Sequence, residues 1–172
     1  MNKLLFYILT ALALTSCQPS APKQTATPTA SNSTVTAPAF SADSAFAYIE
    51  AQCNFGARVP NSDAHRACGD YLVEKFKRFG LQVVEQRANL ASWDGTMLNV
   101  RNITASHNPE ATKRILLCAH WDTRPWADND PNPANHRQPV MGANDGASGV
   151  AVLLELARTS KDFPQDLGID FV

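Results

Sequence analysis

The sequence predicts an α/β fold with a mixed sheet, and three segments in its second half carry this prediction. Residues 114–119 (RILLCA) form a short, continuous apolar run, which is typical of a strand buried on both faces. Residues 146–160 repeat apolar side chains at helical spacing, and residues 168–172 open another apolar run. A strand, a helix and a strand in this order predict a right-handed crossover and a parallel pair.

Two helices and two outer strands are expected before this unit. Ser41 is placed to cap a helix that ends near Cys53, and one of the polar residues 61–63 (NSD) is placed to cap a second helix. Residues 81–88 and 97–104 alternate in part and are separated by a turn. This pattern predicts two strands that each have one face exposed to water.

The charge balance excludes a strongly basic nucleic-acid binder. The chain has 172 residues, with 15 Lys and Arg against 16 Asp and Glu, so its formal net charge is −1. A protein that binds nucleic acid usually shows a basic excess, so we expect no nucleic-acid partner. Hydrophobic residues make up 44% of the chain, as in globular proteins.

The N-terminus has the pattern of a targeting segment. Residues 1–16 combine a positive start, an apolar run that is too short to span a bilayer, and small residues at the end. Residues 14–17 (LTSC) resemble the bacterial lipobox, which implies cleavage before Cys17 and lipidation of that cysteine. The alternative is an ordinary signal peptide with a chance cysteine. We expect an exported protein, lipid-anchored to a bacterial membrane and facing the periplasm or the cell exterior.

Residues 17–40 are expected to be the lipidated cysteine followed by a tether. The segment consists mostly of Ala, Ser, Thr and Pro, so it has little apolar surface to bury. The folded part is therefore expected to comprise residues 41–172. Its last apolar run begins just before the sequence ends, so we expect residues 41–172 to be the N-terminal part of a larger domain.

Two cysteines of the folded part are candidates for a disulfide. The exported context permits a bridge between Cys53 and Cys68. The alternative is a pair of buried thiols. Cys118 lies in the apolar run 114–119, where it is expected to act as a small hydrophobic side chain.

Two short segments contain histidine and aspartate side chains that could bind a metal. His120-Trp121-Asp122 follows the apolar run directly, and ligands of parallel sheets collect at the carboxyl ends of strands. On an extended segment Asp122 points to the same side as His120, where it can accept the second imidazole N–H of a metal-bound histidine. Residues 142–149 (GANDGASG) surround Asp145 with small residues. Asp145 either caps the following helix or binds a metal.

Taken together, the two segments resemble the M28 zinc-peptidase family, and in detail its bacterial relatives of animal-type glutaminyl cyclases. Residues 55–60 (FGARVP), 64–69 (AHRACG) and 120–125 (HWDTRP) are similar to that group's signatures. The resemblance implies a zinc-exopeptidase-like three-layer αβα fold with a mostly parallel mixed central sheet, incomplete at its C-terminal end. It also implies Zn²⁺ as the cofactor.

The resemblance assigns roles to the residues of these segments. Asp145 is a zinc ligand in both the cyclases and the two-zinc peptidases. His120 is a ligand in the peptidases, whereas in the cyclases it lies beside the metal, and Asp122 acts as its partner. In the family the remaining ligands, a Glu and a His, and the acid/base Glu fall beyond Val172. No catalytic residue is therefore expected within residues 41–172.

The activity that the resemblance implies is glutaminyl-peptide cyclisation. The substrates would be peptides or proteins with an N-terminal Gln, which is converted to pyroglutamate with release of ammonia. The alternative is an M28 metal-dependent aminopeptidase, and a further alternative is a non-catalytic, membrane-tethered binding domain. The other histidines show no partner pattern and are interpreted as surface or loop residues: His65, His107 and His136.

Overall fold

The structure of the protein, a computed structural model, describes residues 36–164 and 166–172. The chain divides into two units, Met1–Thr36 and Ala37–Val172, and all elements described below belong to the second unit. The predicted signal peptide, Cys17 and residues 18–35 of the predicted tether lie outside the described residues. Within the described part of the chain, every helix is too short or too polar to cross a bilayer.

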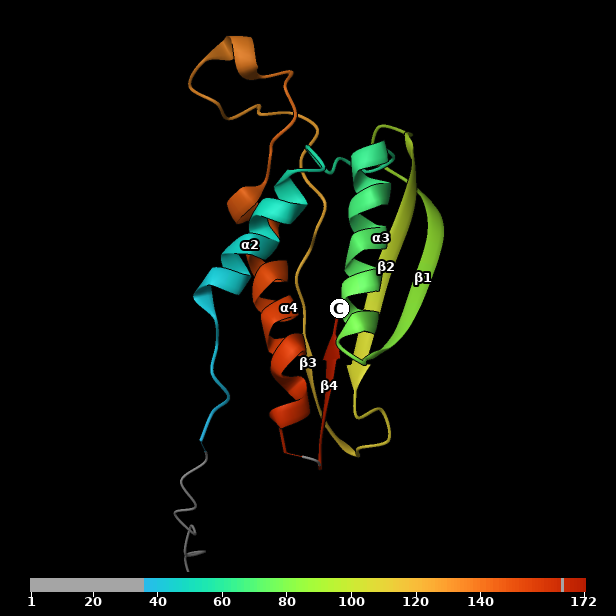
Figure 1. Cartoon of the computed structure of the whole chain (residues 1–172). Helices are drawn as coiled ribbons and strands as arrows, with labels where there is room; N and C mark the ends of the chain where they lie inside the picture. The colour runs from blue at the N-terminus through green and yellow to red at the C-terminus, as the bar shows by residue number, and fades with distance from the viewer. Residues whose placement is uncertain (1–35, 165) are drawn as a thin grey trace, which may run out of the picture. The chain divides into compact units, whose positions relative to one another are not determined.

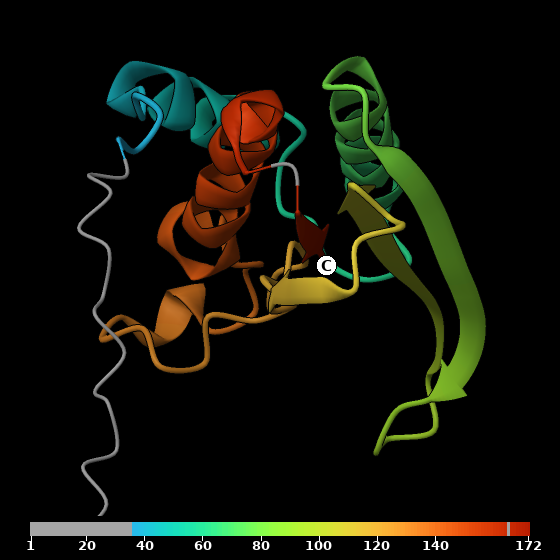
Figure 2. The same ribbon diagram turned by 90° about the horizontal axis from the view of Figure 1, so that it is seen from below.

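Three α-helices organise the described part: α2 (Ala42–Cys53), α3 (Asp63–Arg78) and α4 (Gly149–Thr159). Helices α3 and α4 lie against one face of the sheet, and α2 packs alongside α4 (Figures 1 and 2). Three short helical turns complete the set: η1 (Pro133–Asn135), η2 (Ala143–Ser148) and η3 (Ser160–Asp162).

The predicted helix starts are confirmed. The Ser41 hydroxyl accepts a hydrogen bond from the Ser44 N–H at 3.1 Å, and the Ser62 hydroxyl accepts one from the His65 N–H at 3.1 Å. These bonds satisfy backbone donors that have no partner within the first turn of a helix. Ser62 is thus the cap among the three candidates at residues 61–63.

Four strands form one sheet in the order β1-β2-β4-β3. Their bounds are Gln82–Ala91 for β1, Met97–His107 for β2, Lys113–Leu117 for β3 and Leu167–Phe171 for β4. The predicted parallel pair is β3 and β4, whereas β1–β2 and β2–β4 are antiparallel. The α/β class and the mixed sheet are therefore as expected, with antiparallel pairing more frequent in this part of the sheet.

The prediction that residues 114–119 are buried on both faces is wrong for the described part of the chain. Ile115 is 44% exposed and Leu116 63% exposed, and Cys118 is exposed as well. The reason is that β3 lies at the edge of this sheet, and the described helices cover one face (Figure 2). The central strand is β4, whose Ile169 and Phe171 are buried.

The core lies between the sheet and helices α3 and α4. The face of α3 that the sequence predicts, with Cys68, Leu72 and Phe76, is buried there. The Phe76 ring stacks on Phe171 of β4 with centroids 6.1 Å apart, and Leu154 of α4 is fully buried in the same cluster. Burial of each large apolar side chain contributes about 1.5–3 kcal/mol, so this cluster fixes how α3 and α4 sit on the strands.

The sheet is also held by a polar cluster that links β2, β3 and β4. Arg114 of β3 donates to both carboxylate oxygens of Asp170 on β4, at 3.0 and 2.6 Å, and Ser106 of β2 donates to the same carboxylate at 2.6 Å. The Arg114 hydrogen bond is the largest influence and, together with the Ser106 bond, outweighs burial. The pKa of Asp170 is therefore lower than its ordinary value.

The Asp170→Asn variant should therefore be destabilised in a pH-dependent way. A carboxyl whose pKa is lower in the folded state stabilises the fold above its unfolded-state pKa, and this contribution is lost as the pH falls through the folded-state pKa. We expect Asp170→Asn to lower the free energy of unfolding at neutral pH, and the deficit to shrink in acid. Urea unfolding over a pH series measures this. Glu50→Gln, at an exposed carboxylate on α2, is the control. An equal deficit at neutral and acid pH would contradict the assignment.

The predicted disulfide is not formed in this structure, which contains Cys53 and Cys68 as free thiols. Cys68 is fully buried on α3, and its burial raises the pKa of the thiol to about 12. Cys53, at the end of α2, is close enough to contribute to that rise electrostatically. A bridge between them therefore stays a prediction.

Thiol counting on the purified protein decides whether this bridge forms. Alkylation under denaturing, non-reducing conditions should label only Cys118 in residues 41–172 if Cys53 and Cys68 are bridged. All three thiols should react after reduction, which is the control for accessibility. Three labelled thiols without reduction would exclude the bridge.

Candidate metal centre

The first part of the site is the segment that follows β3. Trp121 is 8% exposed, and its indole stacks on the His65 imidazole of α3 with centroids 4.0 Å apart. A side chain on Gly69 would clash with the same indole, because its Cβ would lie 2.9 Å from it. Trp121 is thus fixed inward against α3, so the residues before and after it point outward.

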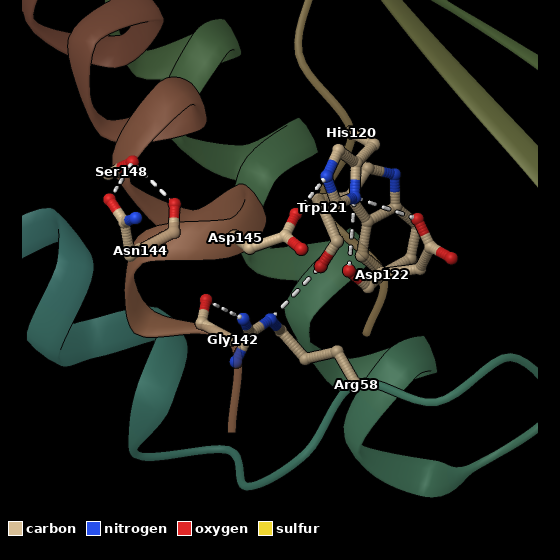
Figure 3. A network of polar contacts seen from close by, with 8 residues as sticks. All are labelled: Arg58, His120, Trp121, Asp122, Gly142, Asn144, Asp145 and Ser148. Carbon is tan, nitrogen blue, oxygen red and sulfur yellow. Dashed lines mark hydrogen bonds and ion pairs between the residues drawn. The ribbon is translucent and has the colours of Figure 1, made fainter. Parts of the chain in front are cut away.

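His120 and Asp122 lie on the same side of this segment, as the sequence predicts. The His120 Nδ1 lies 3.3 Å from a carboxylate oxygen of Asp122 and 3.2 Å from its backbone carbonyl (Figure 3). The interpretation of His65 as a surface or loop residue is wrong, since His65 is in α3 and 7% exposed. Its stacking partner is distant in sequence, and no local pattern indicates the contact.

The second part of the site is the turn before α4. Asp145 lies within η2, but its backbone angles (φ −106°, ψ 96°) are not helical. The N-cap of α4 is Ser148, so Asp145 is not the capping residue of that helix. Its carboxylate instead extends toward His120 (Figure 3), which removes the simpler of the two explanations for this residue.

The two parts meet at a short contact. The His120 Nε2 lies 2.7 Å from a carboxylate oxygen of Asp145, and both side chains are more than half exposed. Burial alone would lower the pKa of His120, but the hydrogen bond to Asp145 and the negative charge of Asp122 outweigh it. The pKa of His120 is therefore higher than its ordinary value.

Two glycines allow this approach. A Cβ on Gly146 would lie 2.2 Å from the His120 carbonyl oxygen and 2.8 Å from its ring. Gly142 has a left-handed backbone (φ +65°), and a Cβ there would lie 2.4 Å from the side chain of Thr123. Small residues at these positions therefore let the two segments pack in direct contact, as the composition of GANDGASG suggests.

Two buried polar side chains hydrogen-bond to the backbone of these two segments. The sequence analysis did not single out either residue. The Arg58 guanidinium donates to the backbone carbonyls of Trp121 at 3.0 Å and of Gly142 at 2.8 Å. The Gln52 amide donates to the carbonyl of Ala147 at 3.0 Å. Both side chains are 0% exposed. The presence of Arg58 in the FGARVP segment was the only available signal for either residue.

A cavity of about 640 Å³ opens beside the His120–Asp122 side of this site. One wall is formed by residues 118–122, and the other by residues 98–103 of β2 with Val172 and His65. Its lining combines polar side chains, among them His120 and Asp122, with apolar ones, which is the usual character of a site for a small molecule or a peptide end.

The donor atoms at the centre fit part of a zinc site. Zinc takes imidazole nitrogen and carboxylate oxygen, and His120 and Asp145 present one of each at the same point. Zinc sites need three or four protein ligands, and residues 36–164 and 166–172 contain no group of three or more His, Cys, Asp or Glu that could hold an ion. The metal and positioning roles of His120, Asp122 and Asp145 therefore stay predictions.

Comparisons with known proteins agree with this fold. Residues 102–172 match the model of peptidase family M28. A solved structure described as a leucine aminopeptidase precursor from Bacteroides thetaiotaomicron is 55% identical and covers 80% of this chain, with a TM-score of 0.78. The glutaminyl cyclase of the same organism, bound to N-acetylhistamine, is 54% identical over 79% of this chain, with a TM-score of 0.77.

A Zn-dependent exopeptidase from Parabacteroides distasonis is equally similar, at 54% identity over 79% of this chain and a TM-score of 0.77. The chain spans about half the length of these three structures, since it covers 47% of each. These neighbours have the zinc-exopeptidase-like fold. Residues 102–172 thus carry the pattern of the peptidase M28 family, and the chain is similar over most of its length to bacterial glutaminyl cyclases and zinc-dependent exopeptidases.

Proposed function

We propose that the protein is a zinc-dependent glutaminyl-peptide cyclotransferase. The observation that carries the proposal is the 54% identity to the Bacteroides thetaiotaomicron glutaminyl cyclase over 79% of this chain. The substrate is a peptide with an N-terminal Gln. Its α-amine forms a bond to the side-chain amide carbon, the bond from that carbon to the amide nitrogen breaks, and ammonia leaves with the proton that the amine gives up.

The residues of this chain would bind and orient rather than react covalently. Zinc, when bound, supplies a Lewis acid that polarises the amide carbonyl of the substrate. Asp145 would hold the ion through its carboxylate. The cavity beside His120 and Asp122 provides space for the end of a peptide, and its apolar lining would limit the access of water, which the cyclisation does not use.

The arrangement around His120 fits both the cyclase and the peptidase. Its Nε2 faces Asp145 and its Nδ1 faces Asp122. In the cyclase this imidazole would lie beside the metal and orient the carboxylate that binds it. In a two-metal peptidase its Nε2 would bind an ion while Asp122 accepts the N–H of its Nδ1.

An M28 aminopeptidase is the second candidate. The 55% identity to the structure described as a leucine aminopeptidase precursor favours it, because the shared fold serves both reactions. The two candidates differ in the nucleophile, which is the substrate's own amine in the cyclase and water in the peptidase. They therefore release different products from the same peptide.

The full-length protein, loaded with zinc, should release ammonia from peptides that begin with Gln and shorten none of them. Mass spectrometry should show one product that has lost the mass of one ammonia. The matched peptide that begins with Glu is the control for specificity. Release of free amino acids from several N-termini, without loss of ammonia, would instead establish the aminopeptidase.

Substitution of the two central residues should separate their roles. We expect Asp145→Ala to lose zinc and to reduce kcat/KM by at least about 100-fold, because a ligand to the ion is removed. His120→Ala should lower activity while most of the zinc is retained. Metal analysis of the purified variants together with cyclisation rates measures both effects. An Asp145→Ala protein with full zinc content and turnover would refute the site assignment, and loss of one of two zinc equivalents in His120→Ala would favour the peptidase.

A further inference from the structure

Arg58 is a fully buried arginine whose side-chain hydrogen bonds, in the described part of the chain, run to backbone carbonyls rather than to a carboxylate. It lies in the loop between α2 and α3, at 0% exposure. Arginine is almost never fully buried unless it is paired, because a buried charge loses its hydration. The hydrogen bonds of its guanidinium run to backbone carbonyl oxygens, so its place is fixed by the backbone segments around it.

One guanidinium spans both halves of the candidate site. Its Nε donates to the carbonyl of Trp121 at 3.0 Å, and its Nη2 donates to the carbonyl of Gly142 at 2.8 Å (Figure 3). The Arg58 carbonyl also accepts the Thr123 N–H at 3.1 Å, so Arg58 holds the segment on both sides of Asp122. Because the guanidinium is planar and rigid, the positions of its nitrogens dictate the separation of the two carbonyls.

The third nitrogen of the guanidinium, Nη1, also donates to backbone carbonyls. It donates to the carbonyl of Gln52 at 3.3 Å, at the end of α2, and to that of Gly56 at 3.2 Å. The Gln52 side chain then reaches the carbonyl of Ala147, two residues beyond Asp145. The turn that carries Asp145 is thus held on both sides, at Gly142 and at Ala147, from the same end of α2.

We propose that Arg58 is a positioning residue that fixes the turn bearing Asp145 against the segment after β3 and thereby sets the affinity of the site for zinc. The inference rests on the proposed function, since it takes Asp145 as a metal ligand. Arg58 donates to the carbonyl of Trp121, which is next to His120, and to the carbonyl of Gly142, which is three residues before Asp145. A metal site tolerates displacements of its ligands of only about 0.5 Å, and loss of groups that orient ligands typically weakens metal binding about 10- to 100-fold.

The test compares zinc binding by full-length wild type, Arg58→Lys and Arg114→Lys. Lysine keeps the positive charge at position 58 but lacks the planar set of donors that bridges Trp121 and Gly142. Arg114 also donates to backbone carbonyls, those of Asn108 and Pro109, but at the opposite end of β3. Zinc dissociation constants are measured by competition with a chromogenic chelator, and melting temperatures are measured without zinc.

We expect Arg58→Lys to bind zinc about 10- to 100-fold more weakly than wild type, and Arg114→Lys to bind it as wild type does even where its melting temperature falls. Wild-type affinity in Arg58→Lys would overturn the inference. If Arg58→Lys does not fold, Arg58→Gln, which keeps a planar donor, is judged by the same criterion. If both are unfolded, Arg58 serves the fold alone and the inference is overturned. A wild type that binds no zinc refutes the proposed function instead.

Discussion

A single buried guanidinium joins the end of one helix to two segments that lie between regular elements. Arg58 bonds the end of α2, the segment after β3 and the turn before α4 through their backbone carbonyls. Burial of this charge would be strongly unfavourable without partners, and the carbonyl dipoles supply them. Removal of any one segment would leave a buried donor unsatisfied, so the three segments depend on one another for their positions.

The parallel pair β3–β4 and the alternation of side chains after β3 together determine where His120 and Asp122 lie. The segment that carries His120 begins where β3 ends, and the chain ends one residue past β4 at the same edge of the sheet. Burial of Trp121 against His65 of α3 then decides which side chains face outward. The burial of Trp121 therefore also determines that His120 and Asp122 face outward.

His120 lies at an exposed point between two carboxylates. Asp145 faces its Nε2 and Asp122 faces its Nδ1, and both carboxylates favour the protonated imidazole. Structures described as a glutaminyl cyclase and as a Zn-dependent exopeptidase are similar to this chain to the same degree. One backbone fold can carry different reactions, so the activity depends on the groups at the site rather than on the fold.

The sequence by itself determined the features whose cause is local. Ser41 and Ser62 cap helices because a hydroxyl reaches a backbone N–H three residues on, and His120 and Asp122 share a side because extended side chains alternate. Tertiary structure alone decided that β3 lies at an edge, that His65 is buried and that Asp145 contacts His120 rather than capping α4. The partners of Arg58 at the site lie 63 and 84 residues further along the chain. No local pattern encodes such contacts, because they exist only once the helices pack on the sheet.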